Sequence, residues 1–186
     1  MALDREDSRK TTPIRRLVVA AAVAAAVIAA LFFVTRSREM PSRVAEDYES
    51  FRVGRLPVEL RTNDPKALEK FFVDRGVRFR TRVLDLDMMG YRLVGGAVLD
   101  DGSGNRAFFV YQGKNGEILA CQMYEGDLRD LPRTRDVRQR GDFTFLVFRS
   151  KDQTQVFWQE GDVVCVLASD IPSEDVVRLA MAKAMK

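Results

Sequence analysis

Three glycines lie in the stretch GYRLVGGAVL, residues 90–99, and glycine-rich loops are one means by which proteins hold phosphate groups. Such a loop needs backbone N–H groups turned toward the anion and a helix directly after the glycines. Here the glycine pair is followed by Ala97-Val98-Leu99, which is typical of a strand, and neither the Walker pattern nor the G-x-G-x-x-G spacing is present. We therefore predict a structural motif in which the glycine pair makes a bulge or a close backbone contact. Its residues are Gly90, Tyr91, Gly95 and Gly96.

The titratable side chains form no catalytic pattern. The chain has no histidine, which removes the most common general base and most zinc sites. Asp85 and Asp87 alternate with leucines and share a face, which suits a solvated strand face better than an acid–base pair. We therefore expect no enzymatic activity, no metal site and no cofactor.

The two cysteines, Cys121 and Cys165, lie in the apolar stretches ILACQMY and DVVCVLA. Free cysteine often behaves as a small buried apolar residue, so two core thiols are the favoured interpretation. Because both residues lie near the centres of predicted strands, a disulfide between them is the alternative in an oxidising compartment.

The elements that must position these residues begin with a membrane anchor. Residues 17–34 are eighteen consecutive apolar residues, and at about 1.5 Å per residue they span roughly 27 Å, close to the hydrocarbon thickness of a bilayer. Residues 1–16 hold five basic side chains, whereas the fifteen residues after the helix hold three, which favours a cytoplasmic N-terminus. We expect a single-pass protein of the inner membrane with a cytoplasmic tail, residues 1–16, and a periplasmic body.

The body begins after a predicted linker at residues 35–43, and residues 44–186 are expected to form one α+β domain. Apolar spacing predicts a short helix over 44–52, a helix over 65–75 capped by Asn63 or Asp64, and a C-terminal helix capped by Ser173 that runs to Lys186. Period-two patterns and turn residues predict strands at 56–60, 91–99, 106–112, 117–124, 143–149, 155–160 and 163–168. Residues 125–142 are expected to be a charged connection. This order indicates an antiparallel meander sheet with short N-terminal helices and a C-terminal helix.

Charge bears on the partners of this domain. Residues 35–186 carry 25 basic and 24 acidic side chains, and this near-neutral balance argues against nucleic acid as a partner. Two arginine runs occur at 75–82 and 133–140; solvated faces are the favoured interpretation, and contact with anionic lipid or an acidic partner is the alternative. Alanines recur at a spacing of four in the anchor, which raises the hypothesis of self-association through that helix.

The order of motifs from about Val44 to the C-terminus resembles a known family. The motifs are LPVEL, the Asn-Asp-Pro helix start before Phe71-Phe72, V-x-D-L at 83–86, GYRLVGG, the hairpin at 107–124, Phe157-Trp158 and DVVCVLASDIPSEDVVRLA. Together they resemble the extracytoplasmic sensor domain of proteobacterial transmembrane anti-sigma factors. Members usually begin with a cytoplasmic zinc-binding anti-sigma domain carrying His-x-x-x-Cys-x-x-Cys, whereas sixteen residues without histidine or cysteine precede the anchor here. The resemblance implies either a sensor that works with a separate cytoplasmic anti-sigma or sigma protein, or a sensor domain that is reused in another setting.

Two functions follow as hypotheses. The first is a single-pass membrane regulatory protein of anti-sigma-factor type, whose extracytoplasmic domain senses or binds partners in envelope-stress signalling. The alternative is a membrane-anchored structural or assembly module of an envelope complex without a transcriptional role. In both cases the partners are proteins and the lipid bilayer.

Overall fold

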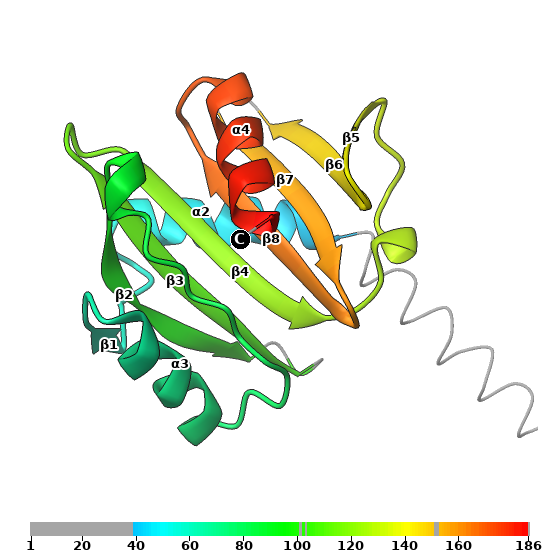
Figure 1. The fold of residues 1–186 in the computed structure, drawn as a ribbon. Coiled ribbons are helices and arrows are strands. Elements are labelled where there is room, and N and C mark those ends of the chain that lie inside the picture. The colour runs from blue at the N-terminus through cyan, green and yellow to red at the C-terminus, as the bar shows by residue number, and fades with distance from the viewer. Residues whose placement is uncertain (1–38, 101, 103, 151–152, 186) are drawn as a thin grey trace, which may run out of the picture. The chain divides into compact units, whose positions relative to one another are not determined.

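A computed structural model describes residues 39–100, 102, 104–150 and 153–185 (Figure 1). The predicted cytoplasmic tail, the predicted membrane helix at 17–34 and most of the predicted linker lie outside these described residues. Among the helices that are described, none has the length and apolar character needed to cross a membrane. Residues Glu39–Lys186 form one contact unit of the chain, and its fold is described below.

The first described helix, α2 (Met40–Arg52), starts inside the predicted linker at 35–43 rather than at residue 44. The reason is Pro41, whose fixed φ suits the first turn of a helix, where its missing N–H has no cost. Met40, Val44 and Tyr48 form the buried stripe of this helix.

The second helix, α3 (Pro65–Asp74), confirms its prediction almost to the residue. Asp64 is the N-cap, and its carboxylate accepts a hydrogen bond of 2.9 Å from the backbone N–H of Lys66. Leu68 and Phe72 are the buried side chains of the helix. Before it, the predicted strand at 56–60 is reduced to β1 (Leu60–Arg61).

In the part of the chain that the structure describes, eight strands form one sheet in which every pairing is antiparallel, so the predicted α+β class is confirmed. Besides β1 they are β2 (Tyr91–Asp100), β3 (Asn105–Gly113), β4 (Ile118–Glu125), β5 (Asp136–Arg140), β6 (Phe143–Ser150), β7 (Gln153–Glu160) and β8 (Val163–Ser169). The spatial order is β1-β2-β3-β4-β8-β7-β6-β5. The sheet is therefore two meanders rather than one, because the chain crosses to the opposite edge after β4. Strand β5 lies in the segment predicted to be a connection, 125–142.

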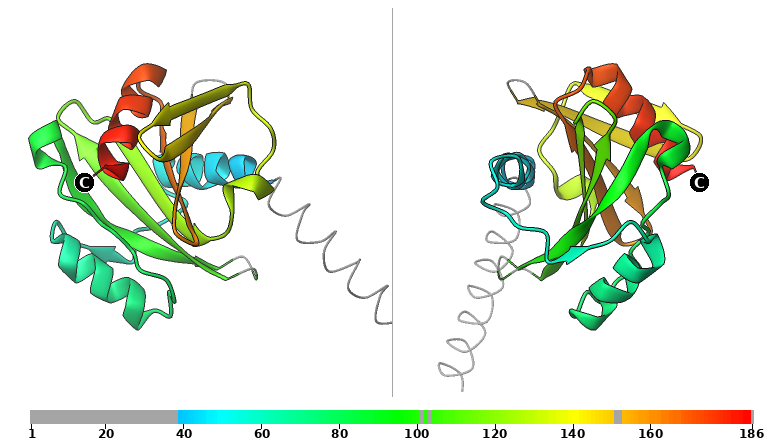
Figure 2. Two further views of the ribbon diagram at one scale, coloured as in Figure 1. Left: turned by 45° about the vertical axis from the view of Figure 1, so that its right-hand side comes forward. Right: turned by 90° about the vertical axis from the view of Figure 1, so that its left-hand side faces the viewer.

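Helices cover both faces of this sheet, α2 on one face and α3 with α4 (Ser173–Ala184) on the other (Figures 1 and 2). Central strands covered on both faces are apolar throughout rather than alternating, and every residue of β8 is accordingly buried. The predicted cap of the last helix is wrong: Ser173 is its first helical residue, and Pro172 precedes it without a side-chain cap. The Ser173 hydroxyl instead accepts a hydrogen bond of 3.0 Å from Arg149 Nε.

Candidate functional site

The glycine motif has a structural role in the fold. The pairing of β2 with β3 passes from Leu93 opposite Tyr111 to Gly95 opposite Val110, so the strand has an irregularity at this point. Gly95 has a φ of 140°, and a Cβ there would lie 2.0 Å from the carbonyl oxygen of Leu60. A Cβ on Gly96 would lie 2.5 Å from the carbonyl oxygen of Phe108. The glycine pair therefore lets β1 and β3 approach β2 on its two sides.

The start of the same motif borders an open hollow of about 490 Å³. Gly90, with a φ of 86°, ends a single 3-10 turn (Asp87–Met89), and Tyr91 begins β2. Asp87, Arg92 and Lys114 line the hollow, and all three side chains are exposed. None of the described residues that line this hollow is buried, so it is not the candidate site.

The two cysteines are free thiols in the structure and lie buried on the sheet face that α3 and α4 cover. Cys121 is opposite Leu167 and Cys165 is opposite Met123, which places the two residues diagonally on neighbouring strands rather than directly across. Burial raises the pKa of Cys121 to about 11 and that of Cys165 to about 12. Neither thiol is therefore a ready nucleophile, and the disulfide alternative is not formed here.

A buried lysine beside these thiols was missed by the sequence prediction. Lys183 is 2% exposed, and its Nζ lies 5.5 Å from the ring centre of Phe109 and 5.3 Å from that of Trp158. It donates a hydrogen bond of 3.3 Å to the carbonyl oxygen of Arg82. The available signal was its position three residues after Ala180, on the apolar side of the last helix. Cation–π contacts of this kind fasten α4 to the sheet.

The two arginine runs divide between structural pairs and exposed side chains. Arg82 of the first run pairs with Glu160, which also accepts a hydrogen bond of 2.7 Å from Trp158 Nε1. In the second run, Arg138 pairs with Asp136 and, at 3.1 Å, with Glu174. The exposed arginines are Arg75, which pairs with Glu59 at 2.7 Å, and Arg78, Arg80, Arg133, Arg135 and Arg140.

A buried polar network joins α2 to the sheet. Arg106 of β3 is 5% exposed; its Nη1 donates to Asp47 Oδ2 at 2.9 Å and to Gln122 Oε1 at 2.6 Å. Gln122 of β4, 1% exposed, donates from Nε2 to the same Asp47 oxygen at 3.1 Å. Arg106 and Gln122 are thus removed from water and share one carboxylate oxygen of Asp47, whose side chain is 22% exposed, and these bonds fix the position of α2.

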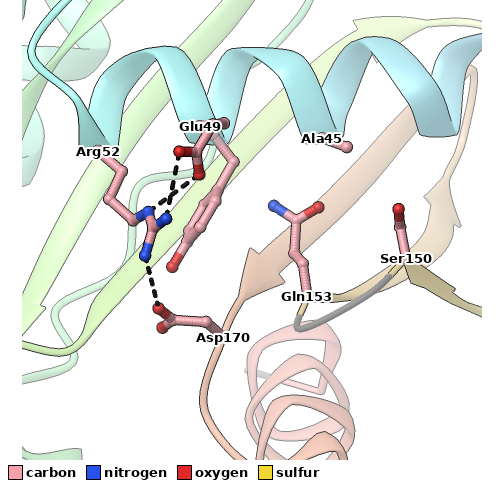
Figure 3. A pocket seen from close by; sticks show the side chains of 7 residues that line it. Ala45, Glu49, Arg52, Ser150, Gln153 and Asp170 are labelled. Atoms are coloured by element: carbon pink, nitrogen blue, oxygen red, sulfur yellow. Dashed lines mark hydrogen bonds and ion pairs between the residues drawn. The ribbon is translucent and has the colours of Figure 1, made fainter.

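A pocket of about 380 Å³ lies between α2, the ends of β6 and β7 and the residue that follows β8 (Figure 3). Its lining residues are Ala45, Tyr48, Glu49, Arg52, Ser150, Gln153 and Asp170. The Arg52 side chain pairs with two acidic residues of the lining: its Nε lies 2.9 Å from the Glu49 carboxylate and its Nη1 lies 4.0 Å from the Asp170 carboxylate. This pocket, which we call the α2 pocket, is the candidate site.

Two residues of this lining carry a fully buried donor, the Tyr48 hydroxyl and the amide nitrogen of Gln153, for which the described residues provide no hydrogen bond of normal geometry. Tyr48 is 3% exposed and Gln153 is 9% exposed. Asp170 and Ser169 are nonetheless hydrogen-bonding neighbours of the Tyr48 hydroxyl. Burial, followed by the effect of Asp170, raises the pKa of Tyr48 above its ordinary value, so the hydroxyl keeps its proton.

Within the described part of the chain no cluster of three or more histidine, cysteine, aspartate or glutamate side chains is placed to hold a metal ion. No protein-family model, no curated protein and no solved structure matches this chain.

Proposed function

We propose that this chain is a single-pass regulator of the inner membrane, of anti-sigma-factor type, whose periplasmic α+β domain works by protein contact. The observation that supports this proposal is the docking of α2. The helix starts at Met40, shortly after the predicted anchor at 17–34, and a buried ion pair and amide hold it on the sheet. A change in how α2 sits on the sheet would therefore act on the segment that enters the membrane.

The edge of the sheet offers a surface for a protein partner. Strand β5 is the last in the order, so one of its sides has no strand beside it in the described residues. Val137 is 47% exposed on this strand, and Arg133, Arg135 and Arg140 are exposed near it. An open strand can pair with an extended segment of another protein through its backbone, and these arginines favour an acidic one.

This proposal requires two partners. One is a separate cytoplasmic anti-sigma or sigma protein, which the chain reaches through the anchor. The other is an envelope protein that docks on β5. The domain would hold or release its partner without catalysing a reaction. Stand-alone structural support of an envelope complex is the competing outcome of the experiment below.

The test is crosslinked affinity purification of the full chain from solubilised membranes, read by mass spectrometry. The variant Arg133→Glu/Arg135→Glu/Arg140→Glu reverses the charge around β5. The matched control Arg61→Glu/Arg92→Glu/Lys114→Glu reverses three exposed charges near the opposite edge. Recovery of a sigma or zinc-binding anti-sigma protein, with an envelope partner lost only in the β5 variant, supports the proposal. Recovery of envelope assembly proteins alone, with unchanged envelope-stress transcripts after deletion of residues 39–186, refutes it.

A further inference from the structure

Strand β5 has two chemically different faces, and it lies at an edge of the sheet that no other described strand covers (Figure 1). Arg138 lies opposite Phe145 of β6, whose side chain is on the face that α3 and α4 cover. Val137 lies opposite Leu146, which packs against the apolar cluster on the α2 face. Side chains alternate along a strand, so Arg140 shares the face of Arg138. A strand that pairs with β5 would therefore meet arginines on one face and an apolar surface on the other.

The arginine face selects acidic side chains. Residues 133–140 hold four arginines and one aspartate, which gives this segment a net charge of +3. Arg138 already pairs with Asp136 and Glu174. Arg140 is exposed, and no acidic side chain among the described residues pairs with it. An acidic strand would neutralise this excess of positive charge, whereas β5 of a second copy would double it, so charge favours an acidic partner over self-pairing.

The opposite face of this edge is apolar and only partly covered. Val137 is 47% exposed, and Leu146 and Phe148 of β6 are half-buried. The helix on this face, α2, packs over β4, β7 and β8. Apolar side chains of an added strand would cover Val137 and extend the apolar cluster toward the edge, which removes apolar area from water. A partner strand that is acidic on both faces would leave this surface exposed.

We propose that β5 binds an extended protein segment in which acidic and apolar residues alternate. The segment pairs with β5 through its backbone, its acidic side chains lie beside Arg138 and Arg140, and its apolar side chains pack on the Val137 side. This inference rests on the proposed function, which places an envelope protein on β5, and adds the sequence pattern that this edge recognises. Binding of a synthetic peptide tests the pattern without a transcript or a cellular partner, so the pattern and the proposed function can fail separately.

The test is a fluorescence-anisotropy titration of labelled peptides with the full chain in a neutral detergent. The main probe is a peptide of alternating glutamate and valine that is long enough to span β5. Its controls are the same residues in blocked order, alternating lysine and valine, alternating glutamate and serine, and the main probe with every backbone amide N-methylated. We expect saturable binding of the main probe and binding at least about tenfold weaker for every control, because each control removes the alternation, the charge, the apolar face or the backbone donors.

Two variants connect this binding with β5. Arg140→Glu should weaken the main probe and strengthen the lysine–valine peptide; its control is Arg92→Glu, which changes an exposed arginine of β2 near the opposite edge. Val137→Asp places a carboxylate on the apolar face and should weaken the main probe at least about tenfold. Its control is Val73→Asp on α3, where the valine is 64% exposed. All four side chains are exposed, so these variants should fold normally.

Four results would overturn the proposal. The first is no saturable binding of the main probe, which would mean that the arginines only protect the edge from other strands. The second is equal binding of the blocked-order or the N-methylated peptide, which would show charge attraction without strand pairing. The third is an equal effect of each variant and its control, which would place the binding elsewhere. The fourth is a lower molar mass of the chain in detergent after Val137→Asp, which would show that β5 pairs with a second copy.

Discussion

The substitution Asp47→Ala tests whether the buried network holds α2 on the sheet. Removing one partner of a buried ion pair typically costs about 3–5 kcal/mol, because the other charge stays buried. The Asp47 side chain is 22% exposed and Arg106 has a further contact, so we take a lower value, about 2–3 kcal/mol. For a chain of this size that loss corresponds to a fall in melting temperature of roughly 5–10 °C.

The assay for this prediction is urea unfolding followed by the fluorescence of Trp158, the only tryptophan, which is fully buried. The control is Asp74→Ala, which breaks an exposed pair with Lys70 and should cost below about 0.5 kcal/mol. Hydrogen exchange should increase in α2 more than in α4, because the network contacts only the former.

A second variant separates buried charge from loss of packing. The triple change Asp47→Leu/Arg106→Met/Gln122→Leu replaces the network by apolar side chains and should recover most of the stability lost in Asp47→Ala. If Asp47→Ala costs no more than Asp74→Ala, or if the triple variant is the least stable of the set, the docking argument fails.

Three further predictions concern other parts of the domain. Gly95→Ala should lower the free energy of unfolding by about 2–4 kcal/mol, because the new Cβ would meet the Leu60 carbonyl oxygen. Gly54→Ala is the control, because a Cβ at that position would meet open space. An equal loss of stability in both variants would refute the clash as the cause. Native protein should resist alkylation by iodoacetamide at pH 8, because both thiols are buried and burial raises their pKa. After unfolding without reductant, both cysteines should be alkylated. If neither cysteine is alkylated under those conditions, the two form a disulfide. The hydrogen bond from Arg138 lowers the pKa of Asp136 below its ordinary value of 3.8, although burial acts in the opposite direction. The stability that Asp136→Asn removes should therefore be fully present above about pH 4 and should disappear at lower pH. A stability difference between the two proteins that does not change with pH in urea unfolding would contradict this.

The predictions that succeeded rest on local signals, and the failures rest on tertiary ones. Asp64-Pro65 specifies a helix start whatever surrounds it, and alternating apolar residues specify most strands. Strand β5 has no such pattern, because its ladder with β6 is formed by the charged run Asp136–Arg140 at the sheet edge. Sequence periodicity cannot detect a strand of which neither face is buried in the core.

The α2 pocket could not be predicted for a related reason. Its lining comes from α2, from the ends of β6 and β7, and from the segment after β8, and only the strand order brings these together. Apolar spacing predicts the helix that carries Tyr48, but the surroundings of its buried hydroxyl depend on the residues opposite it, Ser169 and Asp170. The network of Asp47, Arg106 and Gln122 joins three elements in the same way.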